Sequence, residues 1–169
     1  VAAGVDATIF RIFPDHPLYF MTCIGFYFVL PELLIERRYT VPTGGLAVSL
    51  VIATGLGMWF LAYPPLNNVE YSVIEMGLLD KLSREIMTDP VRMIWFCLLA
   101  VLAAFRFSSF SPATVLFWAN VLLMLKAPIS WDKYILPLLV CLWYLKALEN
   151  PGEKENNLDH SLRVEMYQK

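Results

Sequence analysis

The stretch PLYFMTCIGFYFVLPELLI, residues 17–35, decides the class of fold to which this chain belongs. It is apolar except for Glu32 near its end, and Glu36, Arg37 and Arg38 close it. The hydrocarbon core of a bilayer, about 30 Å thick, needs roughly 20 predominantly apolar residues in a helix. The stretch therefore predicts a transmembrane helix.

The composition of the whole chain points the same way. Of its 169 residues, 58% are hydrophobic and 17% are charged, whereas a soluble domain carries about 25% charged residues. Such an apolar content also excludes a disordered chain. The 13 Lys and Arg residues are balanced by 15 Asp and Glu residues and form no large basic block, so no nucleic-acid partner is expected. The composition predicts an all-α, polytopic helical bundle in a membrane.

Five segments are long and apolar enough to be considered as spans, two of them on the short side. They cover residues 17–35, 42–63, 91–107, 112–125 and 134–148. Pro31 and Pro137 should each kink the helix that contains it, unless the proline lies in the first helical turn. Residues 1–148 are thus predicted to form a single transmembrane domain.

The two ends of the chain differ in character. Residues 149–169 are polar, begin with the helix stop Asn150-Pro151-Gly152 and predict a solvated tail. The other end, from Val1, has neither a basic region nor a cleavage-site pattern, so we expect no signal peptide here. We expect the chain to begin inside a longer precursor or to have been trimmed.

The longest interior loop contains an amphipathic helix, predicted at about residues 72–87. The apolar face between Met76 and Met87 holds Leu78, Leu79, Leu82 and Ile86, and the polar face holds Asp80, Lys81, Arg84 and Glu85. Such a helix could lie in the membrane interface. It could equally be a short helix that caps the bundle against other protein.

Basic residues near the span ends favour one orientation. Arg37 and Arg38 follow the first span, Arg106 the third and Lys146 the fifth, so all lie on one side if all five segments cross. The positive-inside rule then places the N-terminus outside and the C-terminus in the cytoplasm. The basic residues predicted on the opposite side are Lys81, Arg84, Arg92, Lys126 and Lys133. Arg37, Arg38 and Arg92 are assigned to the membrane interface.

Residues able to bind a cofactor are few. His16 and His160 are predicted on opposite sides of the membrane, so we expect no haem bound by this chain alone and no metal site. Cys23, Cys97 and Cys141 lie in apolar runs and should pack as small apolar side chains. Motifs of the GxSxG, HExxH and phosphate-binding type are missing, so no catalytic residue is predicted.

Glu32, Arg106 and Asn120 are the strongly polar residues that the predicted spans place deepest. Glu32 and Arg106 lie near span ends, where ion pairing or snorkelling explains them as well as function does. Asn120 lies well inside the fourth span. Its amide is expected to hydrogen-bond between helices.

The most distinctive segment is the turn KAPISWDKYILP, residues 126–137. Two cations and an indole ring at headgroup height would suit a lipid-linked phosphate and its sugar. An ordinary aromatic belt with snorkelling lysines is the alternative, and physical chemistry alone favours it. The candidate lipid- or donor-binding residues are Lys126, Ser130, Trp131, Asp132, Lys133 and Tyr134.

This turn resembles one in the C-terminal membrane half of the polyprenyl-phosphate-sugar-dependent glycosyltransferases of the GT-C class. That pattern is Ser-Pro-(Ile/Val)-Ser-Trp, an acidic or His residue, a Tyr or His, and an apolar run with Pro. Ala127 replaces its first Ser, and Lys133 stands where His is usual. The resemblance covers residues 63–145. It includes an upstream external-loop pattern, matched here by Pro65, Asn68, Ser72 and Gly77-Leu78-Leu79.

The resemblance implies a lipid-linked sugar donor as partner, bound without completed glycosyl transfer, because the family's catalytic carboxylate lies in an N-terminal half with no equivalent here. The alternative is a non-catalytic accessory subunit of a larger membrane complex, of respiratory or photosynthetic type, that packs against partner helices. In both cases membrane lipids are expected around the chain. A transporter is less favoured, because the sequence has no midplane charge pair and no inverted repeat.

Overall fold

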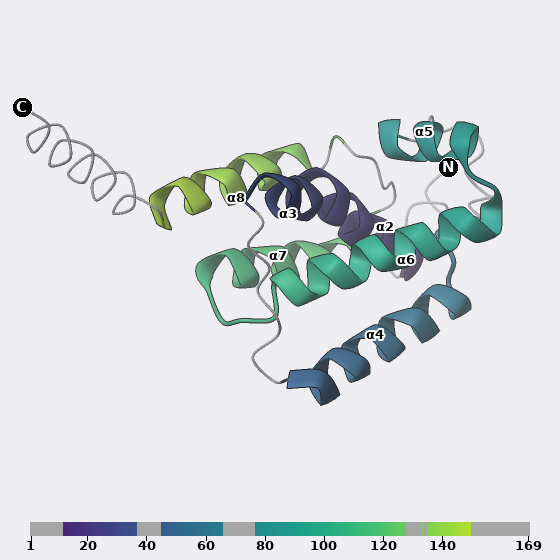
Figure 1. Ribbon diagram of the computed structural model, residues 1–169, viewed down its shortest axis with the longest axis horizontal. Coiled ribbons are helices and arrows are strands. Elements are labelled where there is room, and N and C mark those ends of the chain that lie inside the picture. The colour runs from purple at the N-terminus through teal and green to yellow at the C-terminus, as the bar shows by residue number, and fades with distance from the viewer. Residues whose placement is uncertain (1–11, 37–44, 66–76, 128–132, 134, 150–169) are drawn as a thin grey trace, which may run out of the picture.

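The computed structural model describes residues 12–36, 45–65, 77–127, 133 and 135–149, and this part of the chain is all-helical (Figure 1). The all-α prediction is therefore confirmed for these residues. The helices are α2 (Asp15–Ile24), η2 (Gly25–Val29), α3 (Leu30–Glu36), α4 (Gly45–Ala62), α5 (Leu78–Ile86), α6 (Asp89–Arg106), α7 (Pro112–Met124) and α8 (Leu136–Glu149). The segments α2, η2 and α3 follow one another without a break.

Pro31 is accommodated by a change of helix type. The turn η2, just before it, is a π-helix in which the Leu30 N–H donates to the Gly25 carbonyl, five residues back. Proline has no N–H, and its ring crowds the carbonyl four residues earlier, so a wider turn relieves both problems. Pro137 is the second residue of α8. It therefore lies in the first turn, where a missing N–H costs nothing.

The central seam of the molecule joins α2, η2 and α3 to α6, which runs parallel to them. The Thr22 hydroxyl donates to the Phe96 carbonyl at 3.1 Å. Three residues on, Gly25 lies so close to α6 that an added Cβ would fall 2.2 Å from the Leu99 carbonyl oxygen. Each pair is 74 residues apart in sequence, as are Glu32 and Arg106 farther along. One register thus holds along the seam from Thr22 to Glu32.

The other helices alternate in direction around this seam. Figure 1 shows α4 and α7 running opposite to α6, with α8 running parallel to it and α5 at the end where α6 begins. The N–H of Phe13 donates to the Leu125 carbonyl at 2.9 Å, which joins the start of the first helix to the end of α7. One end of the bundle therefore carries the start of α2 and the end of α7.

The interior is built from aromatic rings and small residues. Phe28 stacks on Phe107 with centroids 6.0 Å apart, and Phe107 stacks on Phe117 at 4.3 Å. Ala100 and Ala103 are fully buried on α6, which allows neighbouring helices to approach. Of the cysteines, Cys23 packs in this core and Cys97 is half-buried. Cys141 is exposed on α8, contrary to the prediction that it packs among apolar neighbours.

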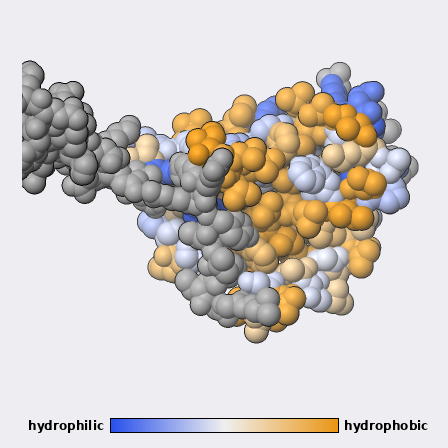
Figure 2. All heavy atoms as spheres, viewed as in Figure 1, coloured by the Kyte–Doolittle hydropathy of each residue, from blue (hydrophilic) through white to orange (hydrophobic). Residues whose placement is uncertain are grey.

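The outer surface is strongly apolar. Figure 2 shows hydrophobic residues spread over much of the visible face. Exposed large apolar side chains occur on every long helix and include Ile35, Val51, Leu61, Ile94, Leu123 and Val140. Within the described ranges, the helix Asp15–Ile35 alone has the length and hydropathy to cross a membrane. Ala47–Ala62, Pro112–Met124 and Leu136–Leu148 are shorter apolar helices.

Candidate functional site

The Glu32 cluster, made of Glu32, Arg106 and Lys146, lies inside the bundle where α3, α6 and α8 meet. Arg106 donates to both carboxylate oxygens of Glu32, from Nε at 2.7 Å and from Nη2 at 3.1 Å. Lys146 Nζ donates to Oε1 at 2.9 Å. The Glu32 and Lys146 side chains are each 9% exposed, and that of Arg106 is 22% exposed. A single carboxylate thus ties three helices together.

The helix register explains why these residues meet. Arg106 ends α6 and Lys146 lies in the last turn of α8, and both helices run parallel to α3. Lys146 Nζ lies 5.1 Å from the centre of the Trp143 ring, so the cations are bordered by aromatic faces. The sequence left pairing and snorkelling open for Glu32 and Arg106. The structure shows pairing, in which two cations face one carboxylate.

The Asp80 cluster, made of Asp80, Arg84, Asp89 and Arg92, lies where α5 meets α6. Arg84 Nε is 2.7 Å from Asp80 Oδ2, and Arg92 Nη1 is 3.9 Å from Asp80 Oδ1. Arg92 Nη2 is 3.0 Å from Asp89 Oδ1. Arg92, assigned from the sequence to the membrane interface, is buried between these carboxylates. Arg37 and Arg38, assigned with it, lie outside the described residues.

Helix α5 turns a mixed face toward the bundle, and Lys81, Arg84 and Glu85 of its polar face are exposed. Leu79, Asp80 and Ser83 are its buried residues. Leu78, Leu82 and Ile86, which follow one another at intervals of four, are 67%, 46% and 68% exposed. The apolar stripe of α5 therefore points away from the described part of the bundle.

Of the candidate donor-binding residues, Lys126 and Lys133 belong to the described structure. Both are exposed, Lys126 just after α7 and Lys133 shortly before α8. Ser130, Trp131, Asp132 and Tyr134 lie outside the described residues. The two lysines therefore mark where the turn leaves one helix and approaches the next.

His16 anchors the start of this turn, a role that the sequence did not predict. Its Nδ1 donates to the Ala127 carbonyl at 2.7 Å, across 111 residues of sequence. The imidazole also stacks on Phe13 with ring centroids 4.9 Å apart. At the other end of the turn, Ile135 is buried. Ala127 and Ile135, which are described residues at the two ends of this segment, are thus held to the bundle. The only hint of this in the sequence was a His before the first span.

The remaining polar groups are the Asn120 amide and the side chains that could bind a metal. The Asn120 amide donates to the Leu116 carbonyl at 2.8 Å, within its own helix. The prediction of a bond between helices is therefore wrong for this contact: α7 offers a carbonyl one turn back on the same face. No group of three His, Cys, Asp or Glu residues converges in the part of the chain that the structure describes.

Two charged clusters and an attached, lysine-flanked turn are thus the features that could carry function. Ala127, near the start of the turn, lies at the end of the bundle where α2 begins and α7 ends. The Glu32 cluster lies toward the opposite end. No protein-family model, no curated protein and no solved structure matches this chain.

Proposed function

We propose that this chain is a multi-pass membrane module that binds a polyprenyl-phosphate sugar at the turn between α7 and α8. The proposal assigns binding to the module and leaves completion of glycosyl transfer to another part or partner. The observation that carries it is the pair of exposed lysines, Lys126 and Lys133, on either side of a turn that His16 attaches to the bundle.

Location in a membrane is supported by the apolar outer surface. Helices α4 and α7 are apolar on all sides, with exposed residues such as Val51, Leu61 and Leu122. Water-soluble proteins rarely expose contiguous apolar patches of this kind, whereas lipid-facing helices require them. The polar side chains of the core pair with one another or with backbone carbonyls, as lipid-embedded bundles demand. We propose that α2–α3, which has the length and hydropathy of a full span, crosses the bilayer and that the shorter helices α4, α6, α7 and α8 cross it beside α2–α3.

The interfacial position of α5 is supported by the direction of its apolar stripe. The Asp80 cluster holds α5 to the bundle, and Leu78, Leu82 and Ile86 face outward. An exposed apolar stripe on a strongly amphipathic helix suits the boundary between headgroups and acyl chains. Of the two interpretations of this segment, we favour the interfacial one. With the N-terminus outside, α5 and the lysine-flanked turn would face the exterior.

Donor binding is supported by the chemistry of the turn. Lys126 and Lys133 are ammonium groups at the ends of a turn that also contains Trp131. Ammonium groups bind phosphate oxygens through charge-assisted hydrogen bonds, and an indole ring packs against sugar faces. The buried carboxylate at this end of the bundle, Asp80, is engaged by arginines. It is therefore a poor candidate for a catalytic base.

The test is a binding measurement on the full chain in lipid nanodiscs, with a short-chain polyprenyl-phosphate glucose as the probe. We expect Trp131→Ala combined with Lys133→Ala to weaken binding about tenfold or more, because each charge-assisted contact contributes roughly 1.5 kcal/mol or more. Lys81→Ala, which removes an exposed lysine of α5, is the matched control. Unchanged affinity in the double variant would exclude the turn as a donor site.

A non-catalytic accessory subunit is the second candidate, and α4 is the observation that favours it. This helix packs against α6 and leaves Leu50, Val51, Met58 and Leu61 exposed. A partner helix could cover these residues. Purification from native membranes in mild detergent decides between the two candidates, because recovery as a free monomer argues against an obligate subunit.

A further inference from the structure

The first long helix changes character at η2, between α2 and α3. Every residue from His16 to Ile24 on α2 is buried. Of residues 30–35, Glu32 alone is buried, and Leu34 and Ile35 are 69% and 77% exposed. Burial of apolar surface therefore holds α2 in the bundle. The buried contact of residues 30–35 is a single charged side chain.

The backbone is weakest where these two parts of the helix join. The Leu30 N–H donates to the Gly25 carbonyl across the π-helix η2, and Pro31 has no N–H to donate. Helices bend at prolines and at π-turns, because an intrahelical hydrogen bond is missing or displaced there. Both features lie at the point where the helix stops being buried. They give α3 a place about which it can turn.

The part of the helix before Leu30 is fixed in the bundle. Gly25 lies so close to α6 that an added Cβ would collide with the Leu99 backbone. Phe28 is 1% exposed, and its ring contacts those of Phe107, just after α6, and Trp143 of α8. Bending at Pro31 would therefore move α3 and leave α2 and η2 in place.

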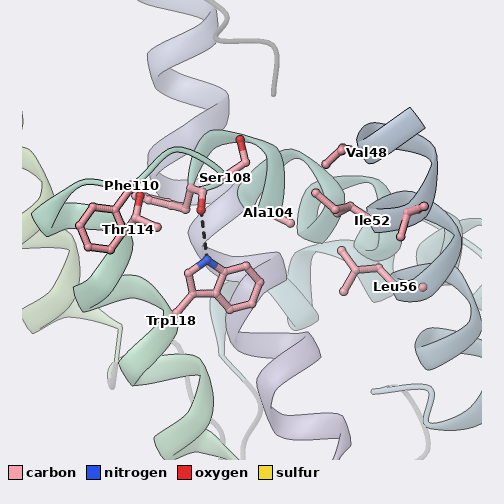
Figure 3. Close-up of a pocket in the computed structure, with 11 residues that line it drawn as sticks. Val48, Ile52, Leu56, Ala104, Ser108, Phe110, Thr114 and Trp118 are labelled. Carbon is pink, nitrogen blue, oxygen red and sulfur yellow. Dashed lines mark hydrogen bonds between the residues drawn. The ribbon is translucent and has the colours of Figure 1, made fainter. Parts of the chain in front are cut away.

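The guanidinium that binds Glu32 also belongs to the fixed part. Arg106 is the last residue of α6, and the carbonyl of the next residue, Phe107, accepts from Trp118 Nε1 of α7 at 3.0 Å (Figure 3). The Phe107 ring also stacks on Phe117 of α7 with centroids 4.3 Å apart. The end of α6 is thus tied to α7, so that Arg106 offers Glu32 a fixed binding point.

The contacts of Glu32 form and break together. Arg106 donates to both carboxylate oxygens, a geometry that holds only over a narrow range of angles between α3 and α6. Lys146 Nζ of α8 donates to Oε1 at 2.9 Å. All three hydrogen bonds end on one side chain, so a rotation of α3 that breaks one of them also strains the others. Such an attachment favours two distinct positions of α3 over a continuous range.

We propose that α3 pivots about a hinge at Leu30 and Pro31 and that the Glu32 cluster holds it in a closed position against α6 and α8. In the open position, the Glu32 carboxylate leaves Arg106, and α3 departs from the axis of α2. A ligand that binds one of the two positions more tightly would shift α3 toward that position. This proposal concerns a motion of the chain and does not rest on donor binding at the turn between α7 and α8.

Distances between two spin labels measure the position of α3 directly. The full chain, with its three cysteines replaced by alanine, is labelled at two introduced cysteines in detergent micelles. The pair at Ile94 and Ile35 joins the start of α6 to α3, and the pair at Ile94 and Val115 lies within the fixed part. All three side chains are more than half exposed. With Glu32 present, we expect one narrow distance distribution for each pair.

Glu32→Gln removes the charge that holds α3 closed. We expect the Ile94–Ile35 distribution to widen by about twofold or more, or to gain a second maximum, because α3 samples open positions. The Ile94–Val115 distribution should keep its width. Glu85→Gln, the same exchange at an exposed residue of α5, is the matched control and should leave both distributions unchanged.

Pro31→Ala tests the hinge separately from the charge. Alanine restores the N–H that proline lacks, so it should stiffen the connection between η2 and α3. Added to Glu32→Gln, it should return most of the Ile94–Ile35 distribution to the narrow form.

An Ile94–Ile35 distribution that stays narrow in Glu32→Gln would show that other contacts hold α3, which overturns the role of the Glu32 cluster. Equal widening for the two label pairs would mean that the whole bundle loosens, which overturns a motion confined to α3. A width that Pro31→Ala fails to reduce would overturn the hinge at Leu30 and Pro31.

Discussion

The Glu32 and Asp80 clusters are both built from carboxylates and basic side chains, but they are held together in different ways. In the Glu32 cluster, three hydrogen-bonded contacts at 2.7 to 3.1 Å join residues 74 and 114 positions apart. In the Asp80 cluster, all four residues lie between positions 80 and 92, and the Asp80–Arg92 distance is 3.9 Å. The first cluster therefore joins distant helices, and the second joins neighbouring ones.

This difference predicts different energetic roles. Burial removes water from the Glu32 cluster, so losing one partner leaves an uncompensated charge in a medium of low dielectric constant. Arg84 of the Asp80 cluster is 48% exposed, so water can replace part of its interaction. We expect the Glu32 cluster to control the stability of the whole bundle. The Asp80 cluster should control mainly the attachment of α5.

The largest effect is expected for Glu32→Gln. This substitution leaves Arg106 and Lys146 close together without their carboxylate, and such a loss costs about 3–5 kcal/mol. The free energy of unfolding, measured by SDS titration in detergent micelles, should fall by that amount. A triple replacement of Glu32, Arg106 and Lys146 by Met should recover most of the stability, because it leaves no unpaired charge. A loss below about 1 kcal/mol in Glu32→Gln would mean that the cluster does not hold the bundle.

The next effect is expected at the seam that connects the two clusters. Gly25→Ala places a methyl group against the Leu99 backbone, which cannot move aside as a side chain could. We expect about 1–3 kcal/mol of destabilisation from this overpacking. Gly57→Ala is the control, since its Cβ meets nothing within 4 Å. The same SDS titration applies, and equal loss of stability in the two variants would argue against the close approach of η2 and α6 at Gly25 and Leu99.

A smaller, local effect is expected for Asp80→Asn. The buried Arg92 loses one carboxylate but keeps Asp89 at 3.0 Å. We therefore expect the free energy of unfolding to fall by about 1–2 kcal/mol. Hydrogen exchange of the backbone amides should rise in α5 and the first turn of α6, while α3 and α8 keep their protection. Increased exchange around Glu32 would show that the two clusters are energetically coupled, contrary to this prediction.

The smallest effect is expected for Leu82→Ser, on the exposed stripe of α5. The free energy of unfolding in detergent should change by less than about 0.5 kcal/mol, because nearly half of the Leu82 side chain is exposed. Leu79→Ser on the buried side of the same helix should cost about 2 kcal/mol or more. In lipid vesicles, Leu82→Ser should make α5 easier to cleave by protease. Equal protease resistance of Leu82→Ser and the wild type would argue against lipid contact by α5.

Hydropathy and proline placement made much of the secondary structure predictable. The prediction of an all-α fold follows from long apolar runs such as residues 17–35, because the preference of a segment for lipid or for water depends on its own residues. The amphipathic pattern in residues 76–87 likewise marked α5. Pro137 lies in the first turn of its helix, as expected for a proline that does not kink a helix. Pro31 lies beyond the first turn, and the π-helix η2 before it accommodates the proline instead.

Much of the candidate site could not be predicted, because its contacts cross between distant helices. Glu32 and Arg106 were recognisable as costly charges, but their pairing depends on a register that the close approach at Gly25 sets. The His16–Ala127 bond arises in the same way. Asn120 could bond within or between helices, and the position of the nearest carbonyl decided the outcome.

The sequence by itself determined which segments are helical, because the apolar runs and the helix-breaking residues act locally. The tertiary structure decided which faces of those helices meet. It paired Glu32 with Arg106 and Lys146, and it turned Leu79, Asp80 and Ser83 of α5 inward. The physical reason is that a charge pair forms wherever packing brings its partners within a few ångströms. Packing depends on the shape of every surrounding helix at once.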